Sequence, residues 1–361
     1  MKHVVLSMLR ILFFLFAGLL VLLAAFLVFM TLTEYHPGNK EILAFSGTGL
    51  KTPPSDTLTF LTWNIGYSGL GKDMDFFYEG GRRVRPDREE FNSYLTGILK
   101  LIRSNDTLDF LFIQEADRDS KRSYRTDEVK EIAETANHCT AYAANYQCRF
   151  VPLPVSSPMG RVNSGIVTLS RYEPSRIERI SFSSSFGWPT RLFFLKRCFM
   201  VLVYPLANGK DLVVINTHNS TFDQGGELRK VELKELGDFA AGEYEKGNYV
   251  IIGGDWNNNP PGFSARSFRD GNLAKIVVPP IEENFLPGWH FATDLTLPTN
   301  RDVDIPFRKG LTKTTIIDFF VMSPNLEALS VRTLETDFAW SDHQPVILKV
   351  CLRSYHDLSG K

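Results

Sequence analysis

The chain has 361 residues, of which 43% are hydrophobic and 22% are charged, and its formal net charge is −1. This composition is ordinary for a globular protein, and the length fits one domain of roughly 300 residues or two smaller ones. A net charge near zero excludes a strong overall basic field that would attract nucleic acid, although a local basic patch would not show in this sum.

The first predicted element is an apolar helix that is long enough to cross a membrane. Residues 11–30 contain no charge, and about twenty helical residues span roughly 30 Å, the thickness of the hydrocarbon core of a bilayer. A cleaved signal peptide usually has a shorter apolar region of about 7 to 15 residues, with small residues at the cleavage site. Here Ala24 and Ala25 lie inside the run. We therefore predict an uncleaved transmembrane anchor at residues 11–32.

Positive charge sets the expected orientation of this anchor. Lys2, His3 and Arg10 precede the apolar run, and positively charged flanks tend to stay in the cytoplasm. We expect a single-pass membrane protein with residues 1–10 in the cytoplasm and the following domain outside it. Lysines also follow the run, so the difference in charge between the two flanks is small.

The remainder of the chain is predicted to form a linker, one folded domain and a tail. Residues 33–57 contain several prolines and glycines and little periodicity, which is typical of a linker. Residues 58–353 are predicted to form the domain, and residues 354–361 the tail. Strands are expected at residues 58–65, 108–114, 164–170, 177–182, 191–204, 211–217, 249–252, 314–323 and 345–352, and helices at residues 89–102, 127–137 and 227–243. Many strands with a few helices indicate an α+β or a layered α/β fold in which helices cover the sheets.

A long loop is predicted at residues 66–88, and it contains Arg82, Arg83 and Arg85. Loops of this length inside a compact domain are usually functional or disordered. The arginines either face solvent or form a rim that meets an anionic substrate.

The four cysteines do not form a disulfide framework. Cys198 and Cys351 each lie in an apolar run, which is typical of buried free thiols. Cys139 and Cys148 lie in a polar, aromatic stretch and could close a loop in an oxidising compartment. The sequence leaves open whether Cys139 and Cys148 are bridged or free.

Polar side chains recur at or near the ends of the apolar strands. After the strand at residues 249–252, for example, Gly253 and Gly254 are expected to turn the backbone tightly before Asp255. The full set is Asn64, Glu115, His218, Asp255, Asn257, Asp318, Asp342 and His343. Each residue alone has a structural explanation as a turn or a cap, but buried carboxylates must be paired, hydrogen-bonded or metal-bound. Carboxylate and amide oxygens without thiolates favour Mg²⁺ or Mn²⁺ over structural zinc, and the two histidines remain available for proton transfer or for holding an oxyanion.

Seven segments that contain these residues carry a resemblance to a known family. The segments are LTWNIG (61–66), FIQEAD (112–117), NSGIVTLSR (163–171), INTHNS (215–220), GGDWNNNP (253–260), IIDFF (316–320) and SDHQPV (341–346). In sequence and order they resemble the motifs of the endonuclease/exonuclease/phosphatase superfamily, which includes apurinic endonucleases, pancreatic-type deoxyribonucleases, neutral sphingomyelinases and inositol polyphosphate 5-phosphatases. The resemblance implies an α+β fold: a four-layer αββα sandwich of two mixed β-sheets with helices outside and the site at one edge, here preceded by one N-terminal transmembrane helix.

The resemblance also implies ligands for a metal ion and for the phosphate. Glu115 resembles the principal ligand of a magnesium or manganese ion, and Asp342 a second carboxylate near it. Asn64 is expected beside Glu115, next to the metal and the phosphate. Asp255 and Asn257 match the pair that positions or activates the attacking water and holds the phosphate.

The remaining matches concern proton transfer. His343 matches the catalytic histidine, Asp318 the carboxylate that orients it, and His218 the histidine that contacts the phosphate or donates a proton. Water must lose a proton as it attacks, and either Asp255 or a His343 held by Asp318 could accept it. The identity of the general base and the number of metal ions therefore stay open. Trp256, between two polar residues of the site, is expected to point into the sheet packing.

The shared motifs leave several substrates open. The sequence favours a membrane-anchored, metal-dependent phosphodiesterase or endonuclease that acts on nucleic acid, with Arg82, Arg83 and Arg85 along the backbone of the substrate. The alternatives are a phospholipid or sphingomyelin phosphodiesterase, a phosphatase acting on inositides or sugars, and a tethered binding module of the same fold. The expected partners are the phosphoester substrate and the membrane, and no motif indicates a protein partner.

Overall fold

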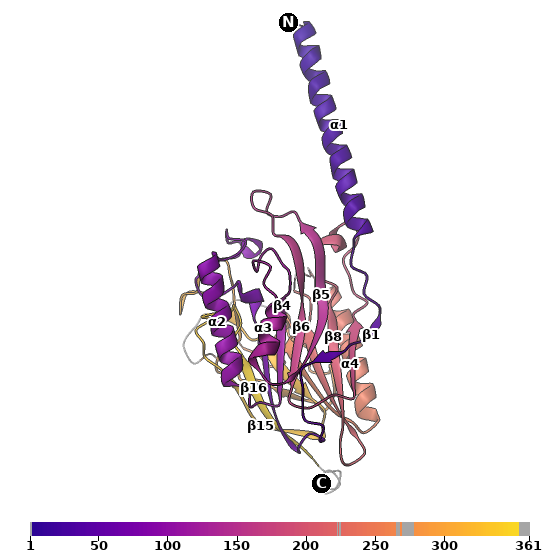
Figure 1. Cartoon of the computed structure of the whole chain (residues 1–361), viewed down its shortest axis with the longest axis vertical. Helices are drawn as coiled ribbons and strands as arrows, with labels where there is room; N and C mark the ends of the chain where they lie inside the picture. The colour runs from indigo at the N-terminus through magenta and orange to yellow at the C-terminus, as the bar shows by residue number, and fades with distance from the viewer. Residues whose placement is uncertain (1, 222, 224, 265–267, 269–277, 354–361) are drawn as a thin grey trace.

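Two mixed β-sheets form the centre of the domain (Figure 1). The computed structural model describes residues 2–221, 223, 225–264, 268 and 278–353, so the predicted tail at 354–361 lies outside the described residues. The first sheet has the order β15 (Leu326–Thr333), β16 (Val346–Leu352), β3 (Thr57–Asn64), β4 (Phe110–Asp117), β6 (Gly160–Ser170), β5 (Cys139–Val151) and β2 (Phe45–Ser46). The second has the order β1 (Lys40–Ile42), β7 (Arg176–Ser181), β8 (Cys198–Pro205), β9 (Asp211–His218), β10 (Tyr249–Asp255), β14 (Asp318–Met322) and β11 (His290–Ala292).

Each sheet contains a parallel pair of strands at its centre. β3 runs parallel to β4 and β9 runs parallel to β10, whereas the other pairs in the two sheets are antiparallel. A separate two-stranded sheet joins β12 (Asn300–Arg301) to β13 (Thr314–Thr315). Because parallel neighbours end on the same side, the ends of β3 and β4 meet at one edge, as do those of β9 and β10.

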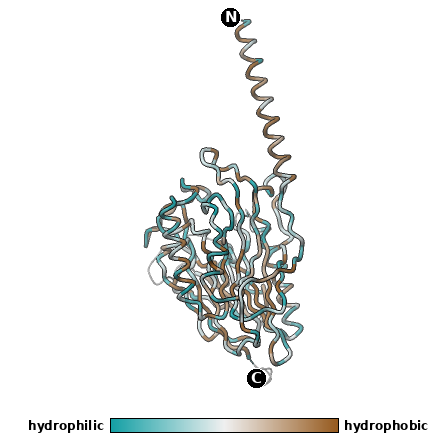
Figure 2. Tube along the Cα trace, viewed as in Figure 1, coloured by the Kyte–Doolittle hydropathy of each residue, from teal (hydrophilic) through white to brown (hydrophobic). Residues whose placement is uncertain are grey.

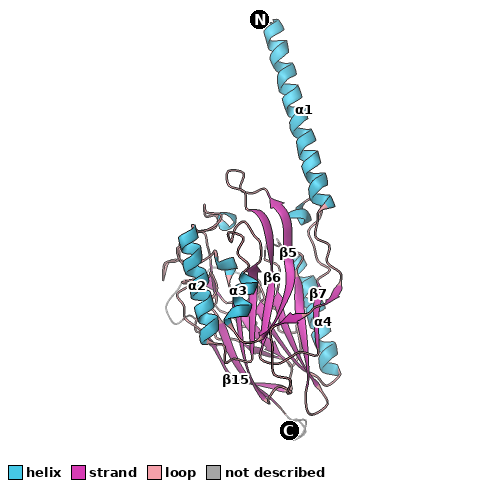
Figure 3. Ribbon diagram, viewed as in Figure 1, coloured by secondary structure: helices cyan, strands magenta, loops and turns pink. Residues whose placement is uncertain are grey.

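The two large sheets pack face to face, and helices cover their outer faces (Figure 3). Phe60 and Phe112 of the first sheet lie in one buried cluster with Val214 and Ile251 of the second. Helices α2 (Arg88–Ser104) and α3 (Glu128–Thr135) cover the outer face of the first sheet, and α4 (Glu227–Glu245) covers that of the second. The predicted four-layer αββα sandwich is therefore confirmed.

The apolar N-terminal segment forms helix α1 (Lys2–Leu32), which projects away from the domain (Figures 1 and 2). The most apolar stretch of 18 residues in this helix has a mean hydropathy of 3.1, and none of these residues is buried. Length and composition allow this helix to cross a membrane. A helix that exposes so many apolar side chains is unfavourable in water, because each apolar square ångström left in water costs about 25 cal/mol.

The segment predicted as a linker, residues 33–57, contributes two short edge strands. β1 pairs with β7, and β2 pairs with β5. Strands of three and two residues carry too little periodicity to be recognised in a sequence.

Three further differences from the predicted elements have local causes. β5 has four alanine and asparagine residues among its thirteen, which lowers its apparent β-propensity. β15 is an edge strand whose central residues are exposed, so it lacks an apolar face. The predicted strand at 314–323 is interrupted, and Asp318 begins β14 rather than lying inside a strand.

All four cysteines are free, so Cys139 and Cys148 are not bridged.

Candidate active site

Strand register brings the predicted polar residues of the second sheet together. His218 ends β9 and Asp255 ends β10, and the parallel register pairs these two residues directly. On the other side of β10, the antiparallel register pairs Asp255 with Asp318 at the start of β14. Asp255 therefore has a predicted site residue on each neighbouring strand.

Close packing of β10 against β9 depends on glycine. β10 continues through Gly253 and Gly254 to Asp255, so the glycines are part of the strand and not the tight turn that the sequence suggests. Gly254 has φ +150°, and a Cβ atom there would lie 2.0 Å from the carbonyl oxygen of Thr217. Only glycine fits this position, and it sets how closely Asp255 approaches His218.

The residues of the first sheet reach the same edge from β3 and β4. Asn64 ends β3, and its Nδ2 donates to Glu115 Oε1 at 3.3 Å and to Asp255 Oδ2 at 3.0 Å. Glu115 lies at an irregularity in the pairing of β4 with β6 and has φ +58°. Strain of this kind in a non-glycine residue commonly marks a functional position. Asn64 thus joins the two sheets at the site.

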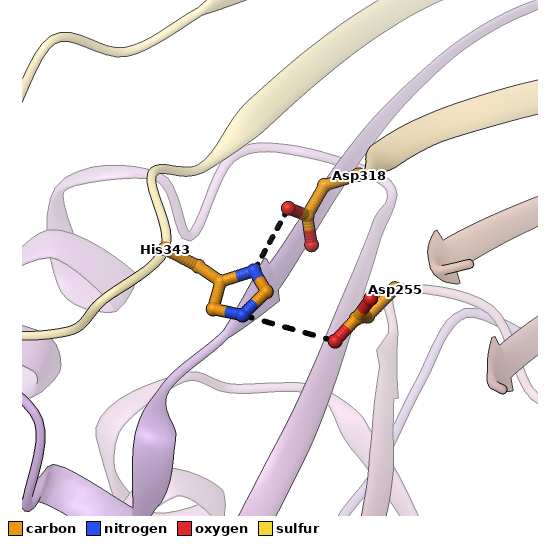
Figure 4. Close-up of side chains that lie close together, drawn as sticks. All are labelled: Asp255, Asp318 and His343. Atoms are coloured by element: carbon orange, nitrogen blue, oxygen red, sulfur yellow. Dashed lines mark hydrogen bonds and ion pairs between the residues drawn. The ribbon is translucent and has the colours of Figure 1, made fainter. Parts of the chain in front are cut away.

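His343 and Asp318 form a buried pair (Figure 4). His343 Nδ1 lies 2.8 Å from Asp318 Oδ2, and His343 Nε2 lies 3.8 Å from Asp255 Oδ2 on the opposite side of the ring. The loop that carries His343 is held to β3, because Ser341 Oγ donates to the carbonyl oxygen of Asn64 at 2.8 Å. Trp63 Nε1 donates to the carbonyl oxygen of His343 at 3.0 Å. The imidazole is therefore fixed with one nitrogen toward Asp255.

Asp255 lies at the centre of the cluster and is 1% exposed. Its Oδ1 accepts the backbone N–H of Asn257 at 3.0 Å, and its Oδ2 lies 3.4 Å from His218 Nε2. Burial raises the pKa of Asp255 to about 6, against the opposing effect of His343. A carboxyl group with this pKa changes its charge near neutral pH, which suits a proton acceptor.

The pKa values of the two histidines are shifted in opposite directions. Burial alone would lower the pKa of His343, but the carboxylates of Asp318, Asp255 and Asp342 outweigh burial and hold it well above its ordinary value. Burial and the positive charges of Arg197 and His343 hold the pKa of His218 well below its ordinary value. These directions favour an imidazolium at His343 and a neutral imidazole at His218 near neutral pH.

The site lies in a cavity of about 900 Å³ that has a polar floor and an aromatic wall. The polar floor includes Glu115, His218, Asp255, Asn257, Asp342 and His343, and the aromatic and apolar wall includes Tyr67, Phe76, Tyr146, Leu153, Phe193 and Phe194. Three carboxylates that share this floor need a compensating positive charge, because burial already raises the pKa values of Asp255 and Asp342. Such a set of oxygen donors fits a hard divalent cation. One ligand atom each from Asp255, Asp318 and His343 also lies within 4.8 Å of the others.

A family model of the endonuclease/exonuclease/phosphatase family matches residues 61–343. The chain belongs to this family. Residues 61–343 contain the whole cluster described above, and the match confirms that the chain is a hydrolase that acts on phosphoester bonds. A search of curated proteins finds no match.

Solved structures support the fold of this family member. An endonuclease/exonuclease/phosphatase from Beutenbergia cavernae has a TM-score of 0.57 and 17% identity, and the match covers 82% of this chain and 72% of that one. ANGEL2, a 2′,3′-cyclic phosphatase in complex with adenosine-2′,3′-vanadate, has a TM-score of 0.53 and 16% identity, and the match covers 86% of this chain and 99% of ANGEL2. Truncated TDP2 from Caenorhabditis elegans has a TM-score of 0.50 and 14% identity, and the match covers 82% of this chain and 98% of TDP2.

Three arginines that were predicted to contact the substrate lie outside the lining of the cavity. Arg83 pairs with Glu90 at the start of α2, and Arg85 donates to the carbonyl oxygen of Lys121 at 2.7 Å. Arg82, Arg83 and Arg85 do not line the cavity. Asn257 does line it, although its Nδ2 donates to the carbonyl oxygen of Asn219 at 2.9 Å.

Arg197 and Asn300 are among the cavity residues that were not predicted from the sequence. Arg197 is 8% exposed, and its Nη1 has no hydrogen-bond partner among the described residues. The amide of Asn300 lies 3.0 Å from His343 Nε2. Arg197 precedes an apolar strand and Asn300 begins a strand of two residues, so neither has the strand-end signal that identified the family motifs.

Proposed function

We propose that this chain is a membrane-anchored, metal-dependent phosphodiesterase that cleaves its substrate by attack of water on phosphorus. The observation that carries the proposal is the buried His343–Asp318 pair facing Asp255 across 3.8 Å, on the floor of a cavity lined by carboxylates. In this proposal Glu115, Asp342 and Asn64 hold Mg²⁺ or Mn²⁺. The bound cation supplies charge stabilisation for the phosphoryl oxygens.

Asp255 is the general base in this proposal. Its carboxylate is held by Asn64 and by the backbone N–H of Asn257, and the raised pKa makes it a better proton acceptor than an exposed aspartate. The neighbouring carboxylates raise the pKa of His343, which favours its protonated form, so the proposal does not assign it the role of proton acceptor. Its imidazolium instead stabilises the negative charge that develops on the phosphoryl oxygens, and Asp318 fixes the ring for this purpose.

Two further residues complete the assignment. The neutral His218 directs Nε2 toward the Asp255 and Glu115 carboxylates, at 3.4 and 3.7 Å, and orients them. Arg197 is the phosphate-binding residue, because a buried guanidinium with an unpartnered N–H gains an anionic acceptor when substrate enters. Asn257 contributes a second polar contact to the phosphate.

The membrane anchor in this proposal is α1. Its apolar side chains are exposed, its length exceeds that needed for a bilayer, and the positive residues Lys2 and Arg10 lie near its start. The catalytic domain accordingly lies outside the cytoplasm.

Nucleic acid is the substrate that the sequence favours. The fold neighbour ANGEL2, a 2′,3′-cyclic phosphatase, supports this choice only at the level of shared fold. Arg82, Arg83 and Arg85, which would follow a nucleic-acid backbone, do not line the cavity. The preference for nucleic acid was based on these arginines, so the arrangement of charge around the cavity gives it no support.

Hydrolysis in ¹⁸O-labelled water tests the reaction. The full chain is incubated with bis(p-nitrophenyl) phosphate and Mg²⁺, and the product is analysed by mass spectrometry. We expect one ¹⁸O atom in the phosphomonoester and none in p-nitrophenol, with no turnover in EDTA. Label in p-nitrophenol would contradict attack on phosphorus, and undiminished turnover in EDTA would contradict metal dependence.

A further inference from the structure

The end of α1 packs against the wall of the active-site cavity. Met30 is 2% exposed and shares an apolar cluster with Phe26 and Leu27 and with cavity residues of the domain. The ring of Phe26 stacks on Phe193 with centroids 6.0 Å apart and an interplanar angle of 16°. Phe193 lines the cavity. The anchor and the active site therefore share one apolar surface.

This contact places the cavity wall at the depth of the bilayer. Phe26 lies four residues before Met30, the end of the uncharged run, and four helical residues rise about 6 Å. If residues 11–30 fill the hydrocarbon core, Phe26 lies about 6 Å inside its boundary. Phe193, which stacks on Phe26, and Phe150, which meets it edge-on at 6.2 Å, then lie at the hydrocarbon boundary as well.

Exposed apolar side chains lie on the two segments that contact the end of α1, through Phe150 and through Trp188. We call them the lip: Phe150, Leu153, Val155 and Trp188, which are 38%, 47%, 84% and 55% exposed. Three of the four lie on the end of β5 or in the turn that joins it to β6, and this hairpin rises toward the side from which α1 leaves (Figure 1). Trp188 Nε1 donates to Thr31 Oγ1 of α1 at 3.2 Å. A tryptophan beside the end of a membrane-spanning helix is typical of the membrane interface.

The lip and the cavity wall are continuous. Leu153 belongs to both, and the turn at residues 152–159 joins β5 to β6, two long strands that also contribute residues to the cavity. Exposed apolar side chains grouped in this way mark a protein or membrane contact. The lip adjoins the end of α1, so insertion of α1 into a bilayer already places the lip at the membrane surface. No second binding event is needed for the lip to contact lipid.

We propose that the cavity opens onto the bilayer and takes a membrane phospholipid, with the phosphodiester on the polar floor and the apolar chains along Phe193 and the lip. This inference rests on the proposed function and names its substrate class. In the reaction the oxygen of water bonds to phosphorus and one P–O ester bond breaks. Asp255 takes a proton from the water, the departing alkoxide takes up a proton, and the products are a phosphomonoester and an alcohol.

The test uses the full chain reconstituted into vesicles of phosphatidylcholine, phosphatidylethanolamine, phosphatidylglycerol and sphingomyelin, with Mg²⁺. Lipid cleavage is followed by ³¹P NMR, and the same samples receive bis(p-nitrophenyl) phosphate or a DNA and RNA oligonucleotide. We expect cleavage of at least one of the four lipids. Val155→Glu places a charge on the lip without touching the cavity, and it should lower lipid cleavage by about tenfold relative to the soluble diester.

Leu329→Glu is the matched control for this variant. Leu329 is 49% exposed on β15, a strand labelled far from α1 in Figure 1, so the variant's ratio of lipid to soluble-diester cleavage should equal that of the wild type. Turnover of the soluble diester or of oligonucleotides without cleavage of any of the four lipids would overturn the lipid proposal and leave the proposed function intact. Loss of turnover on every substrate would overturn both.

A second measurement does not depend on activity. Brominated lipids quench tryptophan fluorescence by contact, and Trp188 is the exposed tryptophan of the lip. We expect quenching in reconstituted wild type that falls clearly in Trp188→Phe. Equal quenching in the two proteins would place the lip away from the bilayer and overturn the proposal.

Discussion

His343 Nδ1 lies 2.8 Å from Asp318 Oδ2, and this contact fixes the imidazole with Nε2 toward Asp255. Because the pair acts as one unit, Asp318→Asn and His343→Gln should each lower kcat by about 10²- to 10⁴-fold, and the double variant should lose little more than the worse single variant. Steady-state kinetics on a soluble phosphodiester measure this. His290→Gln, at an exposed position on β11, is the control and should retain wild-type turnover. Fully additive losses would show that the two side chains act separately.

The charge of His343 predicts how stability depends on pH in the metal-free protein. Neighbouring carboxylates raise the folded-state pKa of His343 above that of the unfolded chain. Its contribution to stability is therefore complete below the unfolded value of about 6.5 and is lost as pH rises through the folded value. Urea unfolding in EDTA should show that the free energy of unfolding falls from about pH 7 upward, and less steeply in His343→Gln. Identical slopes in the two proteins would contradict the raised pKa.

Arg197 is expected to bind the phosphate of the substrate. Arg197→Met removes a charged donor, so kcat/KM should fall by about 10- to 100-fold, mainly through KM, and Arg197→Lys should recover part of the loss. The binding of inorganic phosphate, measured by calorimetry, should weaken in parallel. Arg332→Met changes an exposed arginine on β15 and should alter neither value. Unchanged phosphate binding in Arg197→Met would assign this arginine a structural role.

The carboxylates on the cavity floor predict a metal effect that does not depend on turnover. A ligand at a hundredfold excess over its Kd stabilises the folded state by about 2.7 kcal/mol, which raises the Tm of a domain of this size by about 4 °C. We expect this rise with Mg²⁺ in the wild type and in the exposed-site variant Glu327→Gln, and a much smaller rise in Glu115→Gln. A full rise in Glu115→Gln would mean that the cation binds elsewhere.

Gly254 is the position where the site depends most on backbone packing. Gly254→Ala would place Cβ 2.0 Å from the carbonyl oxygen of Thr217, in a backbone conformation with φ +150°. We expect a loss of more than about 3 kcal/mol in the free energy of unfolding, or failure to fold. Gly187 has open space around it, so Gly187→Ala should unfold close to the wild type in the same urea titration. A wild-type midpoint for Gly254→Ala would contradict the close approach of β9 and β10.

The resemblance of seven motifs to a known family was sufficient to predict the family and the four-layer fold, and the apolar strands that end in polar residues located most of the cluster. Asp255 and His218 are examples, since each is the last residue of a buried strand. The expectation for Trp256 is also confirmed: it is fully buried, and its ring stacks on Phe319. The catalytic roles themselves stay predictions.

Contacts between distant segments could not be predicted. Arg197 directly precedes β8 and lies in the cavity because β8 pairs with β9, and its local sequence carries no signal of a site. Arg83 and Arg85 had the stronger signal in the sequence, yet local partners hold both of them. The contact of Phe26 with Phe193 joins segments more than 160 residues apart in the chain and leaves no periodic pattern.

The central claim is that the cluster around Asp255 hydrolyses phosphodiesters. Its most direct test compares the full chain and Asp255→Asn on bis(p-nitrophenyl) phosphate in Mg²⁺ and in EDTA, with circular dichroism to show that both proteins fold. We predict turnover by the wild type in Mg²⁺, loss of it in EDTA, and a loss of about 10²-fold or more in Asp255→Asn. Turnover in folded Asp255→Asn within a few-fold of the wild type would contradict the claim.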